Sequence, residues 1–238
     1  MLVAGACSLT ACAARDAAIP MRIPLSGALA APPEYRLARS WLQKKRAEQP
    51  TSVAGWEVTA RFVDERTGHA QSGRGALAVR PPEALRLQIV GPAGRLALDV
   101  WLGPSGGRLS SPMVGLTERT NPGEHRAGRP TGFLAWWMLH RFQGRVLAVE
   151  RAGTEQHVIV RAPSGELVTF VREASDGDTH VRAIRKTAED EERVAHDGSF
   201  CGHSQYTSAR ARVTVDVRCG EPTPEPRARA FEDPDRLP

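Results

Sequence analysis

Apolar and polar residues alternate with a period of two along most of this chain. The segments with this pattern are 56–62, 77–79, 85–89, 96–102, 145–151, 156–162, 166–173, 179–186 and 209–219. Such alternation is typical of strands with one apolar and one polar face. The connections are short and rich in Gly, Pro and Asp, as in Gly91–Gly94, which favours antiparallel pairing of neighbouring strands.

The period changes to that of a helix in two places. Over 34–48, Tyr35, Ala38, Trp41 and Leu42 recur at helical spacing among basic residues, and Pro50 follows. Over 133–142, aromatic residues crowd a second short segment. Two helices are too few to cover about ten strands completely. The sequence therefore predicts a mainly β protein with a few helices, in which a curved antiparallel sheet forms an unclosed half-barrel covered by short helices.

Four residues near the start, Leu9 to Cys12, match the lipobox that bacterial lipoprotein signal peptidase recognises. We expect Cys12 to be the lipidated first residue of the mature protein. Cys7 fits the pattern less well, because Ala4 stands where Leu9 stands for Cys12. No basic residue precedes the apolar stretch, so we expect the true start codon to lie upstream.

The remaining organisation follows from composition shifts. Residues 1–11 are predicted to be the signal peptide, 12–33 the lipidated cysteine and a flexible tether, and 34–219 the folded domain. Five prolines and mixed charge after Gly220 predict a disordered tail over 220–238. No run reaches the roughly 18 apolar residues that a membrane-spanning helix needs.

The net charge of +5 says little about partners, because only three of the 32 basic residues are lysine and the arginines are scattered. A nucleic-acid partner is therefore not expected. No nucleophile, metalloprotease or nucleotide-binding motif is present, and His196, Asp197 and Ser199 are sequence neighbours, unlike the members of most catalytic triads. We expect a protein that is not an enzyme and has no cofactor.

Cys201 and Cys219 are the two cysteines of the folded domain, and an oxidising envelope favours a disulfide between them. Two alternatives stay open from the sequence. His196 and His203 could join the two cysteines as four ligands of a metal ion, or both thiols could be free.

The order of these features resembles the LolA/LolB-like carriers of bacterial lipoproteins. The resemblance rests on the lipobox, the helix before the first strand, the block GRGALAVRPPEALRLQIVGPAGRLALDVWLG and the segment FLAWWML between two groups of strands. It implies an apolar cavity for acyl chains, with the helices as a lid. It also implies acyl-chain or lipoprotein cargo, a periplasmic carrier protein as partner, and a membrane lipid anchor through Cys12.

The candidate cavity lining consists of the apolar strand faces and the aromatic segment; a closed, packed core is the alternative for the same residues. The candidates are Val58, Phe62, Leu85, Leu87, Leu96, Leu98, Val100, Phe133, Trp136 and Trp137. In the family's outer-membrane receptor, an exposed leucine in one turn inserts lipoproteins into the membrane. The matching turn here, Gly91–Gly94, holds Ala93, whose methyl group buries far less apolar surface.

These observations predict a lipid-anchored protein of the bacterial envelope, at the outer membrane and facing the periplasm, that binds an acyl chain or lipidated cargo. The alternative is a structural or assembly lipoprotein that binds a protein partner without a lipid cavity. An envelope hydrolase is a third hypothesis. A continuous apolar hollow of several hundred Å³ would favour the first reading, and a filled interior would count against it.

Overall fold

The computed structural model describes residues 28–29, 31–112, 116–121, 135–163, 165–173, 181–186, 191–197, 200–210 and 212–235. In this part of the chain the dominant element is one antiparallel sheet of 14 strands. The strands are β1 (Ala28–Leu29), β2 (Ala54–Asp64), β3 (Ala70–Arg80), β4 (Ala84–Val90), β5 (Leu96–Gly103), β6 (Gly106–Ser111), β7 (Leu116–Thr120), β8 (Arg145–Ala152), β9 (Glu155–Arg161), β10 (Leu167–Glu173), β11 (Val181–Lys186), β12 (Glu191–His196), β13 (His203–Ser208) and β14 (Val213–Pro222).

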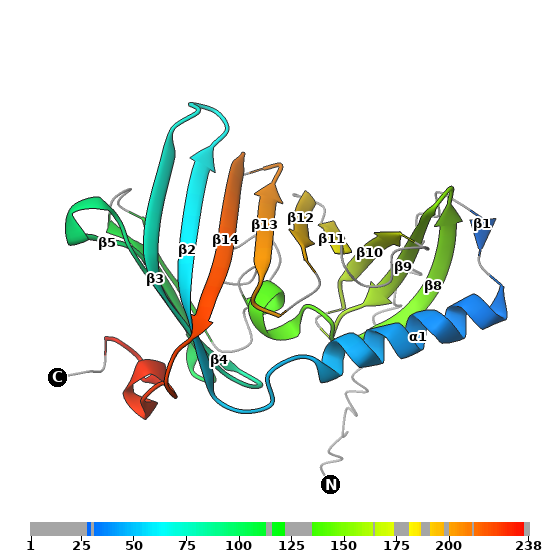
Figure 1. Ribbon diagram of the computed structural model, residues 1–238, viewed down its shortest axis with the longest axis horizontal. Helices are drawn as coiled ribbons and strands as arrows, with labels where there is room; N and C mark the ends of the chain where they lie inside the picture. Colours follow the sequence, from blue (N-terminus) through cyan, green and yellow to red (C-terminus); the bar gives the residue numbers. More distant parts are fainter. Residues whose placement is uncertain are drawn as a thin grey trace, which may run out of the picture.

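The sheet consists of two runs of hairpins joined by its last strand. Strands β2 to β7 follow one another in space, as do β8 to β14, and β14 then pairs with β2. The two edges are β1 and β7, which do not pair with each other, so the sheet is curved but not closed (Figure 1). The predicted fold class, a mainly β protein with an unclosed antiparallel sheet and a few helices, is confirmed.

Helix α1 (Pro32–Ala47) lies along the concave side of the sheet beside β8 (Figure 1). Prolines at its first positions suit a helix start, because their missing N–H groups would have no partner there. Ala38, Trp41 and Leu42 face the sheet and are buried. The hydroxyl of Tyr35 donates a hydrogen bond to the Val146 carbonyl at 2.7 Å, which fixes the helix to the edge of β8.

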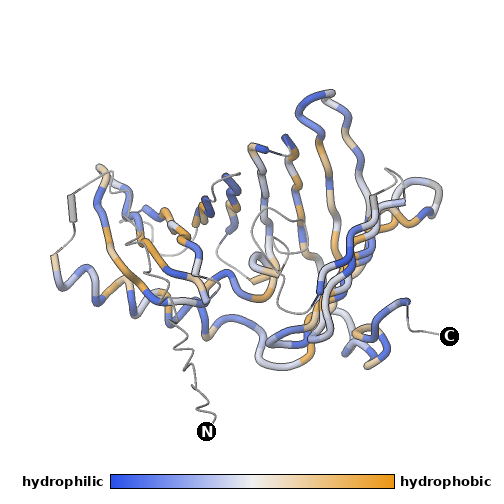
Figure 2. The backbone as a smooth tube through the Cα atoms, turned by 180° about the vertical axis from the view of Figure 1, so that it is seen from behind, coloured by the Kyte–Doolittle hydropathy of each residue, from blue (hydrophilic) through white to orange (hydrophobic). Residues whose placement is uncertain are grey.

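The close approach of β3 and β4 depends on glycine. A Cβ atom built on Gly75 would lie 1.6 Å from the carbonyl oxygen of Gln88, and one on Gly73 would lie 2.7 Å from that of Val90. No side chain fits at such distances, so only glycine lets β4 approach β3 this closely. Apolar and polar stretches alternate along the strands of the sheet (Figure 2).

Several strands lie where the sequence did not predict them. Strands β6 and β7 fall in the Gly-rich stretch 103–132, and β12 falls in the polar loop 187–198. Their apolar alternation is weak, because β6 and β7 carry Ser, Thr, Arg and Glu at several positions. The last strand begins at Val213 and not at Ala209, since Arg212 has a positive φ of 52° in the turn before it.

The predicted disordered tail is wrong for residues 220–235. Strand β14 continues to Pro222, and a 3₁₀ turn, η4 (Ala228–Phe231), packs on the outer face of β4 and β5. Phe231 is buried against Ala78 and Ala84, and the indole N–H of Trp101 donates to the Phe231 carbonyl at 3.0 Å. We call residues 223–235 the C-terminal strap. The burial of Phe231 therefore holds this segment on the sheet, although its proline-rich composition is typical of disorder.

Candidate ligand-binding site

Aromatic side chains from the two helical segments fill the concave side of the sheet. Trp41 of α1 lies 5.6 Å from the ring of Phe170 on β10, and Phe142 lies 5.4 Å from the same ring. The π-helical segment η3 (Trp136–His140) adds Trp137, which stacks on Tyr206 of β13 at 6.1 Å. The helical segment predicted over 133–142 is thus seen from Ala135 onward, where it covers the inner face of β12 and β13.

Most of the predicted lining residues lie in one core cluster under these aromatic rings. Those buried there are Val58, Leu85, Leu87, Leu98, Val100, Trp136 and Trp137. Phe62 is partly buried against the cluster, whereas Leu96 is 36% exposed. Phe133 and Cys12 lie outside the described residues. The structure therefore brings the sheet residues and the two tryptophans together, but it packs them against one another.

The turn with Ala93 forms a short 3₁₀ helix, η1 (Pro92–Gly94), between β4 and β5. Gly94 has a φ of +71°, which favours glycine at the end of this turn. Val90 and Leu96, on either side of the turn, are 40% and 36% exposed. The apolar surface at this end of the molecule therefore includes the residues that flank the turn.

Two hollows in the described part of the chain bear on the candidate site. The smaller, of about 170 Å³, lies between the end of α1, the Pro81–Pro82 turn and the segment after η3, with Val79, Met138, Leu139, Phe142 and Phe200 in its apolar wall. The other, of about 780 Å³, has a wall that combines apolar residues such as Val63 and Val90 with charged ones, Arg61, Arg74 and Arg218 among them. It involves the outer-facing side chains of β13, β14, β2 and β3. Neither is a continuous apolar cavity of several hundred Å³.

A buried ion pair crosses the inner face of β11 and β12. Arg185 donates to Glu192 at 2.6 Å, and the hydroxyl of Tyr206 donates to the other Glu192 oxygen at 3.2 Å. The guanidinium also lies 5.0 Å from the ring centre of Trp136. This network fixes η3 on the sheet through contacts that are polar as well as apolar.

A second buried cation, Arg141, follows η3 directly. Its side chain is 1% exposed, and burial lowers the pKa of its guanidinium to about 10, although the carboxylate of Asp197 opposes this shift. The neighbouring His196 is also buried, and its pKa lies well below the ordinary value. Burial is the main cause, and the positive charges of Arg141 and Lys45 add to it. At neutral pH Arg141 is charged and His196 is neutral.

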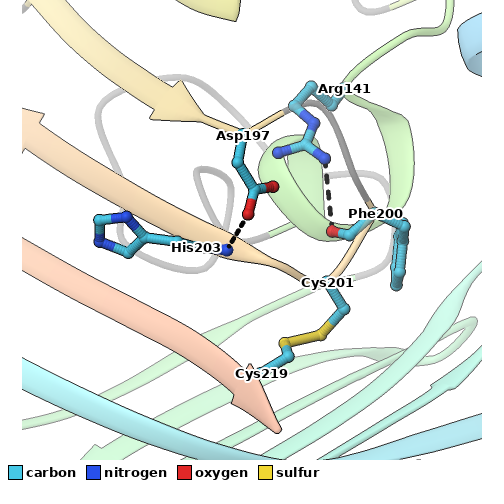
Figure 3. The surroundings of a disulfide bond; sticks show 6 residues. All are labelled: Arg141, Asp197, Phe200, Cys201, His203 and Cys219. Atoms are coloured by element: carbon cyan, nitrogen blue, oxygen red, sulfur yellow. Dashed lines mark hydrogen bonds between the residues drawn. A yellow bond between two sulfur atoms is a disulfide. The ribbon is translucent and has the colours of Figure 1, made fainter. Parts of the chain in front are cut away.

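The disulfide predicted between Cys201 and Cys219 is confirmed, and it holds the loop that faces Arg141 (Figure 3). Because both sulfur atoms are in this bond, the alternatives of a four-ligand metal set and of free thiols do not hold in this structure. The carbonyl of Phe200, next to Cys201, accepts a hydrogen bond from Arg141 at 3.4 Å. The Phe200 ring lies 5.2 Å from that of Trp56.

Sequence reasoning missed Arg141, His196, Arg185 and Glu192 as interior residues. Alternation assigned polar residues to the outer face, and these four break that rule. For Arg185 and Glu192 the sequence held a signal. Arg185 lies two residues after the buried Ala183, and Glu192 lies two residues before the buried Val194. Residues two apart on a strand point to the same face, so both side chains point inward. Nothing in the local sequence of Arg141 indicates its burial.

Comparison with solved structures agrees with this architecture. The chain is similar to a LolA superfamily protein from Nitrosomonas europaea, with 14% identity and a TM-score of 0.55 over 84% of this chain and 99% of that one. A DUF1329 family protein from Desulfovibrio piger matches with 8% identity and a TM-score of 0.50, over 83% and 97% of the two chains. No family model and no curated protein matches the sequence. The chain therefore has a LolA/LolB-like fold.

Proposed function

We propose that this protein binds the acyl chain of a lipid or lipidated cargo between the concave face of its sheet and the segment Ala135–Gln143. The observation that carries the proposal is the apolar pocket beside Phe142 and Phe200, which opens onto the same core that α1 and η3 cover. The LolA/LolB-like fold supports it.

The pocket holds only part of a long acyl chain as it stands. Ligand pockets usually measure about 300–1,000 Å³, and this one measures about 170 Å³. Binding therefore requires the aromatic residues of α1 and of the segment Ala135–Gln143 to move away from the sheet. Arg46 opposes this movement, because its guanidinium donates to the carbonyls of Phe142 and Gly144 at 3.3 and 2.9 Å.

A second function is favoured by the packed interior and by the arginine residues that line the hollow on the outer face. A protein that binds a protein partner needs no cavity, and Arg61, Arg74 and Arg218 would suit an acidic surface. The first function predicts that the protein binds an alkyl ligand, and the second predicts that it does not.

The test uses the full chain with Cys12→Ser, exported to an oxidising compartment. We expect native mass spectrometry to detect a co-purified lipid and hexadecanol to displace a neutral fluorescent probe. Leu139→Gln places an amide in the pocket wall and should weaken probe binding, whereas the matched change Leu37→Gln, at a residue 64% exposed on α1, should not. Absence of both lipid and probe binding would leave the protein-partner function.

We further propose that Cys12 carries the lipid anchor and that the protein works at the outer membrane, facing the periplasm. No helix among the described residues has the length and apolarity to cross a bilayer. A chain exported with a complete lipoprotein signal peptide before Cys12 should incorporate labelled fatty acid and sediment with outer membranes. Cys12→Ser should abolish both, and continued sedimentation of that variant would refute the anchor.

A further inference from the structure

Arg141 is a charged group buried without adequate partners. Its Nη2 atom makes one long hydrogen bond, 3.4 Å to the Phe200 carbonyl, and its guanidinium lies 5.0 Å from the ring centre of Phe142. Its Nε and Nη1 atoms are buried and have no hydrogen-bond partner among the residues that the structure describes. Buried donors are nearly always paired, and an unpaired buried charge is strongly unfavourable.

The surrounding charges do not neutralise Arg141 directly. Asp197 attracts it through space, but the Asp197 carboxylate accepts the backbone N–H of His203 at 2.9 Å, and no hydrogen bond joins the two side chains (Figure 3). Lys45 adds a second positive charge nearby, although it is paired with Glu48 at 2.9 Å. This part of the interior therefore attracts an anion.

The same place borders the apolar pocket. Phe142 follows Arg141 in the chain, and the Phe200 carbonyl accepts the hydrogen bond of Arg141. Both Phe142 and Phe200 line the hollow of about 170 Å³. A cation with two unused donors beside an apolar wall matches an amphiphile with a negative head and an alkyl tail.

We propose that Arg141 binds the anionic head, a carboxylate or a phosphate, of an amphiphile whose alkyl chain enters this pocket. The inference rests on the proposed function and narrows its ligand class. Chains attached to a cysteine through ester and amide groups carry no charge at those groups, and would leave Arg141 unpaired. The ligand is thus an acidic lipid, and its entry displaces the Phe200 carbonyl from the guanidinium.

The test compares three ligands with the same chain length: palmitate, hexadecyl phosphate and hexadecanol, each displacing a neutral fluorescent probe from the Cys12→Ser chain at neutral pH. We expect at least one of the two anions to bind about tenfold more tightly than the alcohol, or more, a ratio that corresponds to about 1.4 kcal/mol. Which anion binds better distinguishes a carboxylate from a phosphate source. Arg141→Met should bring the anion-to-alcohol ratio close to one without lowering hexadecanol affinity.

Arg141→Lys, which keeps the charge, should retain part of the preference. Arg39→Met, at an exposed position of α1, should retain all of it. Hexadecanol binding with no anion preference, or a preference that survives Arg141→Met, would overturn the inference while leaving the proposed function intact. Failure of all three ligands to bind would overturn both.

A measurement on the unsubstituted Arg141 site guards against a variant that fails to fold. With palmitate labelled with ¹³C at its carboxyl carbon, the bound signal should remain that of the ionised form down to about pH 5, because a nearby cation lowers a carboxyl pKa. Burial without a cation raises that pKa instead. A bound carboxyl that titrates at or above neutral pH would contradict the role of Arg141.

Discussion

Individual charged side chains inside the half-barrel have three different environments. Arg185 has a buried carboxylate partner, Arg141 has one long hydrogen bond, and His196 avoids charge by losing its proton. Each arrangement makes a separate prediction, because the free energy of unfolding depends on what compensates the charge.

Glu192→Leu should destabilise the protein by about 3–5 kcal/mol, since it removes the buried partner of the Arg185 guanidinium and leaves the more distant carboxylate of Glu166, at 3.4 Å. The double variant Arg185→Met with Glu192→Leu should recover much of this loss, because the buried guanidinium is then absent and Glu166 is partly exposed. Urea denaturation of the single and double variants checks the prediction. A double variant as unstable as Glu192→Leu would show that packing, and not the charge, is what matters.

Stability should fall as the pH drops below about 6.5, and His196 should contribute to the fall. The pKa of its imidazole is lowered in the folded state, so the unfolded chain binds a proton that the folded chain does not. The contribution is complete above the unfolded pKa and is lost between that value and the folded one, at up to about 1.4 kcal/mol per pH unit. Melting of His196→Gln between pH 7.5 and 5 should show a shallower decline.

At the scale of elements, α1, η3 and the loop after β12 meet around Phe142. Arg46 holds the carbonyl of Phe142 from one side, and the loop with Phe200 approaches from the other. The disulfide joins that loop to β14, so the position of Phe200 depends on a covalent bond as well as on packing.

Removing the disulfide by Cys201→Ala with Cys219→Ala should lower the free energy of unfolding by about 2–4 kcal/mol, as expected for a closed loop of this size. It should also weaken probe binding, because the wall formed by Phe200 loses its tether. Denaturation of the native chain with and without reductant, together with probe titration, checks both effects. Equal probe affinity in the oxidised and reduced forms would show that the position of the Phe200 loop does not affect binding.

Some elements could be predicted from the sequence and others could not. Strong alternation predicted β2, β4, β5 and β8 to β11, and helical spacing predicted α1 within two residues at each end. Strands β6 and β7 were not predicted because their apolar alternation is weak. The strap was not predicted because the contact of Phe231 with the distant sheet determines its structure. In the candidate site it found Trp136 and Trp137 but not Arg141, because the burial of an isolated arginine depends on distant elements.

At the scale of the whole molecule, the C-terminal strap covers an outer face that would otherwise expose Trp101. Arg80 lies over the ring of Phe231 at 4.7 Å, and Arg119 pairs with Asp233 at 3.1 Å. The strap thus combines one buried aromatic side chain with ion pairs at its end, and the aromatic side chain should contribute most of its stability.

Phe231→Ala should destabilise the protein by about 3 kcal/mol, in the range for truncating a buried aromatic residue. It should also make Trp101 accessible to quenching by acrylamide. Asp233→Asn with Asp235→Asn is the matched change to the ion pairs and should cost about 1 kcal/mol or less, since the side chains of Arg119 and Asp235 are 51% and 45% exposed. Equal effects of the two changes would show that the ion pairs stabilise the strap as much as Phe231 does.

The place of β14 has a consequence for the order in which the molecule assembles. The two runs of hairpins can form while the chain is still being made, but β14, the last strand synthesised, is what hydrogen-bonds to both β13 and β2. The halves therefore remain unjoined until nearly the whole chain has emerged, and Cys219 meets Cys201 only then. During synthesis or export, β2 and β13 are open edges that need protection from other chains.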